Sequence, residues 1–530
     1  MSKLIPNAIF LLLALCFVAP RAMGQSTYYI SSSIGSDSNT SAQAKSKTTP
    51  WKNAPAMPGA SGNANSYKPV AGDKFIFMGC DTWTFNGSWN WTFSGTSGNN
   101  VSVGGLDQTW YNTSVCPNAW NRPILSGGGT WPGSTAAFMV NIDASYLEIA
   151  WFEWTGFHYN SVNTSNEIGI ISFGSGDYRQ LHDNYFHGWS HAAGATENED
   201  VNVIYSGAAH DRISYNAFDG ADTDQRSTGA IYAGAEGEEI DHNYFAYQND
   251  TMNFLATLVH DNTFNNAGVV EYIGANDHNN AMESNQDPAS GMLVYNNYYF
   301  QIMGGPNCGN PAGDMNTCGG VGIQIAPPAG ATSYFFNNVV ADASPAGNNV
   351  MCEQSITNPG GTCYIFNNTE ECGADSSLQN GECVRLGGLS GKLPVETLVN
   401  NHFITDITPA PSGTNLVTQT KATANGQGYT LGQTFSFSPT SPNGATVLAG
   451  ANMTATCQAI AKLNQAAGTA CLSDTTYGIN YNTVTHQITG SQRTAVARPT
   501  SGPWDIGAYQ FNGVNASKPN PPTGLTVIVH

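Results

Sequence analysis

One short pattern recurs eight times between residues 178 and 403 of the chain. In each copy an apolar residue lies three positions before an Asn, and a second apolar residue usually follows that Asn by two. The spacing between successive central Asn residues varies from 19 to 41, and only Glu370 breaks the second apolar position. The central residues are Asn184, Asn216, Asn243, Asn262, Asn297, Asn338, Asn368 and Asn401.

A repeat with a constant centre and a variable period predicts a strand–turn–strand unit with insertions in its other loops. Helical repeats do not tolerate such variation, because each one must keep its own register. Ile, Val, Phe and Tyr fill the apolar positions, which favours strands. We therefore predict an all-β parallel β-helix, whose turns stack about 4.8 Å apart. The Asn residues are expected at a sharp bend, in the left-handed backbone region and bonded as a ladder.

The composition limits the partners of this chain. Only 11% of its 530 residues are charged, and 18 Lys and Arg face 38 Asp and Glu, which gives a formal net charge of −20. Phosphate binding draws on clustered cations, so we expect no nucleic-acid partner. Aromatic residues make up 11% of the chain, and their large buried area argues against disorder.

The two ends of the chain predict export and a short tail. Residues 1–24 have the features of a secretory signal, with Lys3 before an apolar stretch from Ala8 to Val18 and a small-residue cleavage motif. That stretch is too short to favour a membrane span, and no second one of membrane length follows. We assign residues 25–512 to one β-helix domain and residues 513–530 to a Pro-rich tail. We expect a secreted or cell-surface monomer with no membrane-spanning segment.

Cysteine usage agrees with export. Cys16 lies in the signal, which leaves ten of the eleven Cys, an even number that favours disulfides in an exported chain. No CxxC pair occurs, so a thiolate metal site is not indicated. The short spacings suggest five local pairs: Cys80–Cys116, Cys308–Cys318, Cys352–Cys363, Cys372–Cys383 and Cys457–Cys471.

Three motifs near the ends of the domain are similar to those of a known group. They are Tyr28-Tyr29-Ile30 with the later Pro50-Trp51-Lys52, Gly72-Asp73-Lys74-Phe75-Ile76, and Trp504-Asp505-Ile506-Gly507-Ala508-Tyr509-Gln510. With the repeat, they make the chain resemble the secreted bacterial right-handed parallel β-helix proteins of the pectate-lyase-like superfamily. The resemblance implies a right-handed coil with an N-terminal cap. Residues 420–500 carry less of the repeat, and we expect this disulfide-stapled segment to act as a C-terminal cap.

Charged residues and most of the His gather on the middle turns of the repeat. If the Asn column faces inward, the residues two positions before it point outward on successive turns: His182, Ser214, Asp241, His260 and Tyr295. Asp241 and His260 would then lie about 5 Å apart, an arrangement suited to a general base held by a carboxylate. We assign this pair a catalytic role, and His182 and Tyr295 a role in substrate binding.

A second outward column lies four positions before each Asn. It places Arg212 beside Glu239, which favours a cross-strand ion pair, although Arg212 is also a candidate for substrate binding. A further polar segment, residues 276–283, ends at Glu283, which we add to the substrate-binding candidates.

The densest polar insertion is the loop of residues 219–226. Asp222 and Asp224 are candidate Ca²⁺ ligands, because carboxylate oxygens are ligands that this ion prefers. Arg226 is a candidate catalytic residue that would bind a uronate carboxylate. An acidic, solvated turn explains the same residues equally well.

Two classes of function fit these features. The first is an extracellular enzyme that acts on a polysaccharide, either a lyase for uronate-containing polymers or a glycoside hydrolase with two carboxylates. The second is a non-catalytic β-helix at the cell surface or in the matrix that binds glycans, because the pectate-lyase-like superfamily holds lyases, hydrolases, epimerases and adhesins. The motif sets of the polygalacturonase branch and of the classical pectate lyases do not occur in the sequence.

Overall fold

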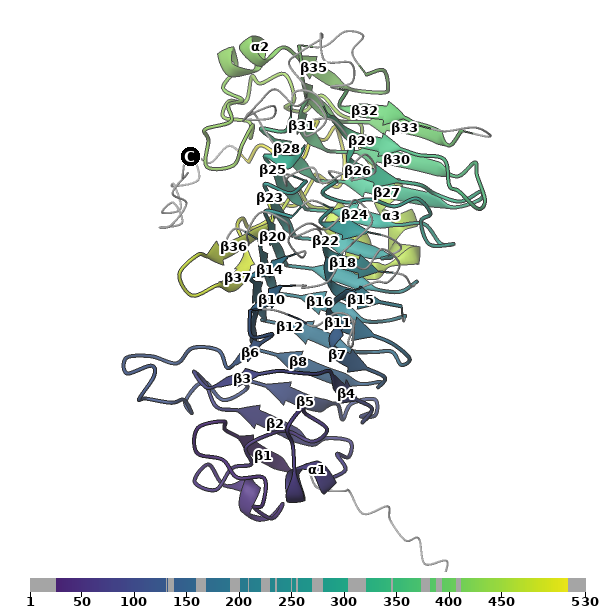
Figure 1. Ribbon diagram of the computed structural model, residues 1–530. Helices are drawn as coiled ribbons and strands as arrows, with labels where there is room; N and C mark the ends of the chain where they lie inside the picture. Colours follow the sequence, from purple (N-terminus) through teal and green to yellow (C-terminus); the bar gives the residue numbers. More distant parts are fainter. Residues whose placement is uncertain are drawn as a thin grey trace, which may run out of the picture.

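The computed structural model shows a coil of short strands stacked one above another (Figure 1). It describes residues 25–129, 131, 138–158, 168–190, 201–207, 209–220, 229–233, 236–248, 250–253, 256–268, 280–303, 321–344, 347–372, 382–387, 393–406 and 411–512. The expected signal and the Pro-rich tail lie outside these residues. Within them, no helix is both long and apolar enough to cross a membrane.

Two parallel sheets of twelve strands run the length of the coil. The first sheet consists of β1 (Thr27–Ile30), β2 (Lys74–Phe77), β5 (Val101–Gly104), β8 (Leu147–Ala150), β12 (Gln180–His182), β16 (Arg212–Ser214), β19 (Glu239–Asp241), β22 (Leu258–His260), β24 (Leu293–Tyr295), β27 (Thr332–Phe336), β30 (Thr362–Phe366) and β33 (Val395–Val399). The second consists of β3 (Thr82–Thr84), β6 (Ile124–Ser126), β9 (Glu153–Thr155), β13 (Tyr185–His187), β17 (Ala217–Asp219), β20 (Tyr244–Ala246), β23 (Thr263–Asn265), β25 (Tyr298–Phe300), β28 (Val339–Ala341), β31 (Thr369–Glu371), β34 (His402–Ile404) and β35 (Val417–Gln419).

Two shorter parallel sheets form the third side of the coil. One consists of β4 (Trp89–Trp91), β7 (Phe138–Ile142), β11 (Ile168–Phe173), β15 (Val201–Ser206), β18 (Gly229–Ala233) and β21 (Met252–Asn253), the other of β26 (Val321–Ile325), β29 (Asn348–Cys352) and β32 (Val384–Leu386). The remaining elements are the parallel pair β10 (Phe157–His158) and β14 (Trp189–Ser190), the hairpin β36 (Ile479–Asn482) and β37 (Gln487–Ser491), the 3-10 helix η1 (Gln43–Lys45), and α1 (Gly62–Ser66), α2 (Lys421–Gly426), α3 (Thr454–Leu463) and α4 (Gln465–Cys471). The expected fold class, a right-handed parallel β-helix, is confirmed.

The repeated Asn residues form the corner between the first and second sheets. All eight are fully buried, and the side-chain amide of each of the first seven donates to the side-chain oxygen of the next at 3.0 to 3.3 Å. The expected ladder is therefore confirmed.

The left-handed residue of each corner is the one before the ladder Asn, not the Asn itself as the sequence suggested. Its φ lies between 54° and 58° in all eight repeats. Turning the chain at this residue lets the following Asn side chain enter the interior, where it bonds to its neighbours. The corner therefore presents the preceding residue outward, and it accepts Asp, Tyr and His there as well as Asn.

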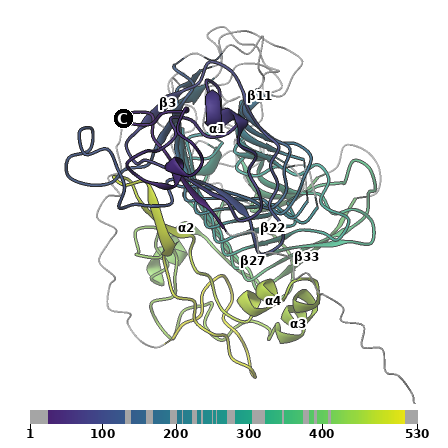
Figure 2. The ribbon, with the colours of Figure 1, turned by 90° about the horizontal axis from the view of Figure 1, so that it is seen from below.

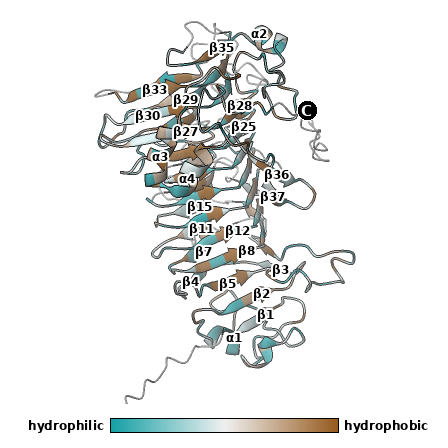
Figure 3. Ribbon diagram, turned by 180° about the vertical axis from the view of Figure 1, so that it is seen from behind, coloured by the Kyte–Doolittle hydropathy of each residue, from teal (hydrophilic) through white to brown (hydrophobic). Residues whose placement is uncertain are grey.

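Aromatic side chains stack inside the coil at the spacing of the turns. In the second sheet, the ring centroids of Phe186, Phe218, Phe245, Phe264 and Tyr299 are 4.7 to 5.1 Å apart between neighbours. These rings fill the second apolar position of successive repeats, and Glu370 occupies that position two turns further along. The hydrophobic residues of the repeat thus form one continuous core, and Figure 3 shows how they recur along the stacked strands.

The C-terminal segment begins at the end of the coil and then returns along its side. After β35 the chain forms α2, and residues 450–512 lie outside the coil, beside its strands (Figure 2). Helices α3 and α4 pack on the outer face of the first sheet, against Tyr295, Phe336 and Phe366. The segment that we expected to act as a cap therefore also covers this face from Tyr295 to Phe366. The reason is that the outward column turns apolar after His260.

The hairpin β36–β37 covers the outer face of the second sheet on the other side of the Asn corner. Tyr481 stacks on Tyr244 at 4.0 Å between ring centroids, and His486 stacks on Tyr185 at 3.8 Å. Arg122 fixes the tip of the hairpin by donating to the carbonyl oxygen of His486 at 3.0 Å. The C-terminal segment thus bridges turns that lie far apart along the coil.

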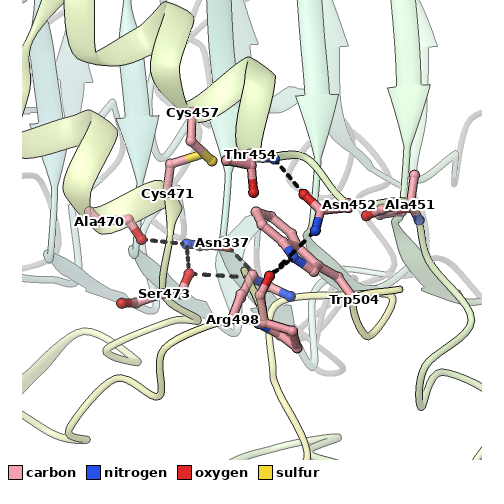
Figure 4. Close-up of a disulfide and its surroundings, with 12 residues drawn as sticks. Asn337, Ala451, Asn452, Thr454, Cys457, Ala470, Cys471, Ser473, Arg498 and Trp504 are labelled. Atoms are coloured by element: carbon pink, nitrogen blue, oxygen red, sulfur yellow. Dashed lines mark hydrogen bonds between the residues drawn. A yellow bond between two sulfur atoms is a disulfide. The ribbon is translucent and has the colours of Figure 1, made fainter. Parts of the chain in front are cut away.

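Four of the five expected disulfides are present, and they are Cys80–Cys116, Cys352–Cys363, Cys372–Cys383 and Cys457–Cys471. Cys308 and Cys318 lie outside the described residues. The bond from Cys457 to Cys471 joins α3 to α4 directly above the first sheet (Figure 4). Beside it, Arg498 donates to the side chain of Asn337, and this contact anchors the returning segment to the Asn corner.

Replacing Asn262 by Ala is expected to lower the free energy of unfolding by about 3 kcal/mol, because it leaves buried amide groups without partners. Its oxygen accepts two bonds from Asn243, and its amide donates to Asn297 and to the carbonyl of Ile240. Denaturant unfolding measures the change. The matched control is Asn443→Ala at an exposed position, expected within about 0.5 kcal/mol of the wild type. Equal stability of the two variants would contradict a stabilising ladder.

Candidate active site

The charged residues of the middle turns lie on one ledge, the outer face of β12, β16, β19 and β22, at mid-height of the coil (Figure 1). The strand register pairs His182 with Ser214, Ser214 with Asp241, and Asp241 with His260. The outward column expected from the sequence is therefore in place. Helices α3 and α4 begin to cover this face at Tyr295, one turn after His260, and close the ledge at that end.

Asp241 is the centre of the ledge. Its side chain is fully buried, and Arg212 donates to both of its oxygens, from Nε and from Nη2, at 2.7 Å each. The Nδ1 of His242 lies 2.8 Å from the same oxygen that Nη2 contacts. Burial alone would raise the pKa of Asp241, but Arg212 and His242 lower it to about 2.

The geometry corrects the expected partner of Arg212. Its Nε lies 3.9 Å from Glu239, whereas the two bonds to Asp241 on the next turn are short and parallel. A two-pronged pairing with a carboxylate fixes the plane of a guanidinium. The Arg212 side chain remains 45% exposed, and its Nη1 has no partner among the described residues. Arg212 can therefore bind an anion without releasing Asp241.

His242 is the residue that the sequence argument missed. It is the left-handed corner residue of its turn, with φ of 54°, so it points outward although it directly follows the outward residue Asp241. Its Nδ1 is held by Asp241, its ring stacks on Tyr215 at 4.7 Å, and its side chain is 18% exposed. Its Nε2 has no partner among the described residues. The sequence signal that could have identified His242 is a His directly before a ladder Asn.

His260 is held differently from the expected Asp241–His260 pair. Its Nδ1 lies 2.7 Å from Asp261 and its Nε2 lies 3.1 Å from Glu239, so both ring nitrogens are engaged by carboxylates other than Asp241. Burial would lower the pKa of His260, but these two bonds raise it to about 9. His260 is therefore protonated at neutral pH. It is therefore a poor base, and it places a positive charge next to Asp241, its neighbour on the adjacent strand.

His182 repeats this arrangement three turns away. Its Nδ1 lies 2.8 Å from Asp183 and its Nε2 lies 3.1 Å from Glu148. Burial would lower its pKa, and the two carboxylates raise it to about 9. Its side chain is 23% exposed, so it remains a candidate for contact with substrate.

The other sequence candidates lie apart from this cluster. Tyr295 is 2% exposed, because its ring is stacked between His260 and Phe336 under the C-terminal segment; its expected role in substrate binding does not fit this burial. Glu283 is 4% exposed, and its backbone forms a parallel β-bridge with Asn253 on the third side of the coil, not on the ledge. The remaining candidates, Asp222, Asp224 and Arg226, lie outside the described residues.

The ledge contains two sets of groups that could hold a metal ion. They are His242, His260 and Asp261, and Glu239, Asp241 and His260; in each set one ligand atom per residue lies within 4.8 Å of the others. Ca²⁺ prefers oxygen ligands throughout, whereas both sets include an imidazole. The carboxylates also already face Arg212 and His260. The described residues therefore do not fit Ca²⁺ well, and the expected Ca²⁺ site at Asp222 and Asp224 stays a prediction.

No protein-family model and no curated protein sequence matches the chain. Among solved structures, the pectate lyase Pel9A is similar at 12% identity and a TM-score of 0.40, over 92% of this chain and 98% of its own. A PL6-family polysaccharide lyase from Pseudopedobacter saltans is similar at 13% identity and a TM-score of 0.37, over 66% of this chain and 88% of its own. The GH136 lacto-N-biosidase from Eubacterium ramulus is similar at 11% identity and a TM-score of 0.38, over 74% of this chain and 67% of its own. The strand topology is that of a parallel β-helix, a fold that does not by itself specify a reaction.

Proposed function

We propose that the protein is a secreted polysaccharide lyase that acts on a uronate-containing extracellular polymer. The observation that carries this proposal is that one buried carboxylate, Asp241, holds Arg212 and His242 together on the ledge. The disulfides are compatible with export. The long, ridged flank of the coil suits a long polymer.

The proposed reaction is β-elimination. The base takes the proton from C5 of a uronate sugar, a C4=C5 double bond forms, and the C4–O bond to the leaving sugar breaks. Arg212 would bind the C6 carboxylate and reduce the negative charge that opposes loss of the C5 proton. C6 is bonded to C5, so a base fixed beside this guanidinium is well placed for that proton.

His242 is the base in this proposal. The bond from its Nδ1 to Asp241 sets the ring orientation and leaves Nε2 as the proton acceptor. The leaving oxygen takes up a proton, and we assign its donation to His260, which is protonated at neutral pH and whose ring centre lies 6.2 Å from that of His242. Asp241 itself positions His242 and Arg212 and exchanges no proton.

A hydrolase is less well supported by the same residues. Hydrolysis of a glycosidic bond needs a carboxylic acid that stays protonated, with a raised pKa. On the ledge, burial would raise the pKa of Asp241 and Asp261, but Arg212 and His260, respectively, outweigh it and hold both values below their usual range. These carboxylates suit the stabilisation of cations.

A non-catalytic, glycan-binding β-helix is the second candidate. Both oxygens of Asp241 and both ring nitrogens of His260 are already paired within the ledge, as they would be in a structural ion-pair network. In that case the ledge would bind a polymer without cleaving it.

The experiment that tests the proposal is to incubate the full chain with a panel of uronate polymers and follow the ultraviolet absorbance of the unsaturated product. A reducing-sugar assay on uronate and neutral glycans runs in parallel. Absorbance that rises with time supports a lyase, and reducing ends without absorbance indicate a hydrolase. Binding of a polymer without either signal would establish the second candidate instead.

Replacing Arg212 by Lys is expected to lower kcat/KM for a uronate polymer about 10- to 100-fold, mainly through KM. Lys keeps the charge but cannot contact Asp241 and a substrate carboxylate in one plane. The matched control is the methyl-esterified form of the same polymer, which lacks the carboxylate that Arg212 is proposed to bind. Steady-state kinetics on both polymers checks this, and an equal loss on the ester would contradict the assigned role.

A further inference from the structure

Two imidazoles and a carboxylate converge at one end of the ledge. A ring nitrogen of His242, a ring nitrogen of His260 and an oxygen of Asp261 all lie within 4.8 Å of one another. Glu239 and Asp241 form an overlapping set around the same His260. The side chains of His242, His260, Asp261 and Glu239 are 18%, 10%, 10% and 33% exposed, so an ion can reach them from solution.

The chemistry of this donor set differs from that of an acidic patch. Two imidazoles with one carboxylate, and space for a further ligand, are typical of zinc and of related first-row transition metals. Positions for such a set arise directly from the fold. His260 comes from the strand, while His242 and Asp261 are corner residues of successive turns, which stack one above the other.

The other end of the ledge provides an internal comparison. His182 is held by Asp183 and Glu148 with nearly the same distances that hold His260 between Asp261 and Glu239. A His whose two ring nitrogens each contact a carboxylate, which we call a clamp, therefore occurs at both His182 and His260. Among the described residues the second imidazole is present at only one of the two clamps, because the corner residue on the turn before His260 is His242, whereas the corner residue on the turn before His182 is Trp151.

We propose that His242, His260 and Asp261 form a binding site for a divalent transition-metal ion such as Zn²⁺, with Glu239 and Asp241 as flanking carboxylates. The ion replaces the hydrogen bonds within the cluster by bonds to the metal, and no redox step is involved. The site stands whether or not the chain cleaves a polysaccharide. If His242 is also the proton acceptor of a lyase, the bound ion occupies that residue and inhibits the reaction.

Direct binding to the full chain, without an affinity tag, tests the proposal. Zn²⁺ is titrated calorimetrically, and Co²⁺ is titrated with visible absorption, which reports the ligand geometry. The expected result is one ion per chain, with the affinity lowered at least about tenfold in His242→Ala and in His260→Gln. The control His182→Ala keeps the wild-type affinity, because its clamp lacks a second imidazole.

Two results would overturn the proposal. One is the absence of stoichiometric binding of either ion to the wild-type chain. The other is binding that His242→Ala leaves unchanged, which would place the ion elsewhere. Thermal unfolding of each variant in the absence of metal verifies the fold, and His242→Ala decides the outcome if His260→Gln is unstable. These readouts need no substrate, so failure of the lyase proposal and failure of the metal site are distinguishable.

Discussion

His242→Ala is expected to lower kcat for a uronate polymer on the order of a hundred- to ten-thousand-fold, the range usual for loss of a general base. The side chain is removed from a partly exposed position, and Asp241 keeps its two bonds to Arg212, so the fold should survive. KM should change little, because Arg212 still binds the substrate carboxylate. Steady-state kinetics with the absorbance assay measures both parameters.

Two controls separate a catalytic role of His242 from a structural one. Added imidazole is expected to restore part of the activity of His242→Ala, which a merely structural loss would not allow. His187→Ala removes another partly exposed His, paired with Glu153 on the second sheet, and should retain wild-type kcat. Full activity of His242→Ala would rule out His242 as the base.

Glu370→Gln is expected to stabilise the protein by about 3 kcal/mol at pH 7. Glu370 is fully buried in the column that otherwise holds stacked rings, and neither of its carboxyl oxygens has a hydrogen-bond partner among the described residues. Burial raises its pKa from 4.5 to about 8. A difference of about 2.5 units between pH 7 and the unfolded pKa corresponds to roughly 3 kcal/mol.

The pH dependence gives the sign of this effect. Below pH 4.5 the carboxyl group is protonated in both the folded and the unfolded chain, so it contributes no difference. Between pH 4.5 and about 8 the unfolded chain releases the proton and the folded chain keeps it, so the wild type loses stability as pH rises. Gln has no proton to lose. The advantage of Glu370→Gln should therefore grow from near zero at pH 4.5 to its maximum near pH 8.

Thermal unfolding of both chains across this pH range checks the prediction. The matched control is Glu371→Gln, one residue away, which loses an ion pair with Lys421 and should not gain stability with pH. A pH-independent difference between the wild type and Glu370→Gln would contradict a buried, protonated carboxyl group.

The sequence was sufficient to predict the coil because one motif recurs with the same centre eight times. Each repeat places an Asn beside the Asn of the next turn, so the register of eight turns follows from aligning the motif although its spacing varies. Four of the five expected disulfides also followed from short spacings. The path of the C-terminal segment did not, since it depends on Phe336 and Phe366 being apolar on an outer face, and a repeat does not distinguish a covered outer face from an inner one.

For the site, the sequence predicted only which residues lie in the same outward-facing column of stacked strands. The register of Asp241, His260 and Arg212 was correct, because stacking fixes which residues are neighbours. Their partners were not, because long side chains choose among several neighbours: Arg212 reaches across one turn to Asp241 and leaves Glu239 to His260. His242 escaped notice because it is a corner residue, and its outward direction comes from a backbone conformation that alternation along a strand does not describe.

The return of the C-terminal segment sets an order of assembly. His486 contacts Tyr185 and Arg122, which are synthesised more than 290 residues earlier. Until α3 and α4 are synthesised, the apolar outer face at Tyr295, Phe336 and Phe366 has no cover, so a chain truncated before α3 should accumulate as aggregate even though its turns can stack. Because the segment after β35 contacts the middle turns, it should also oppose unwinding of the coil from the end at β35.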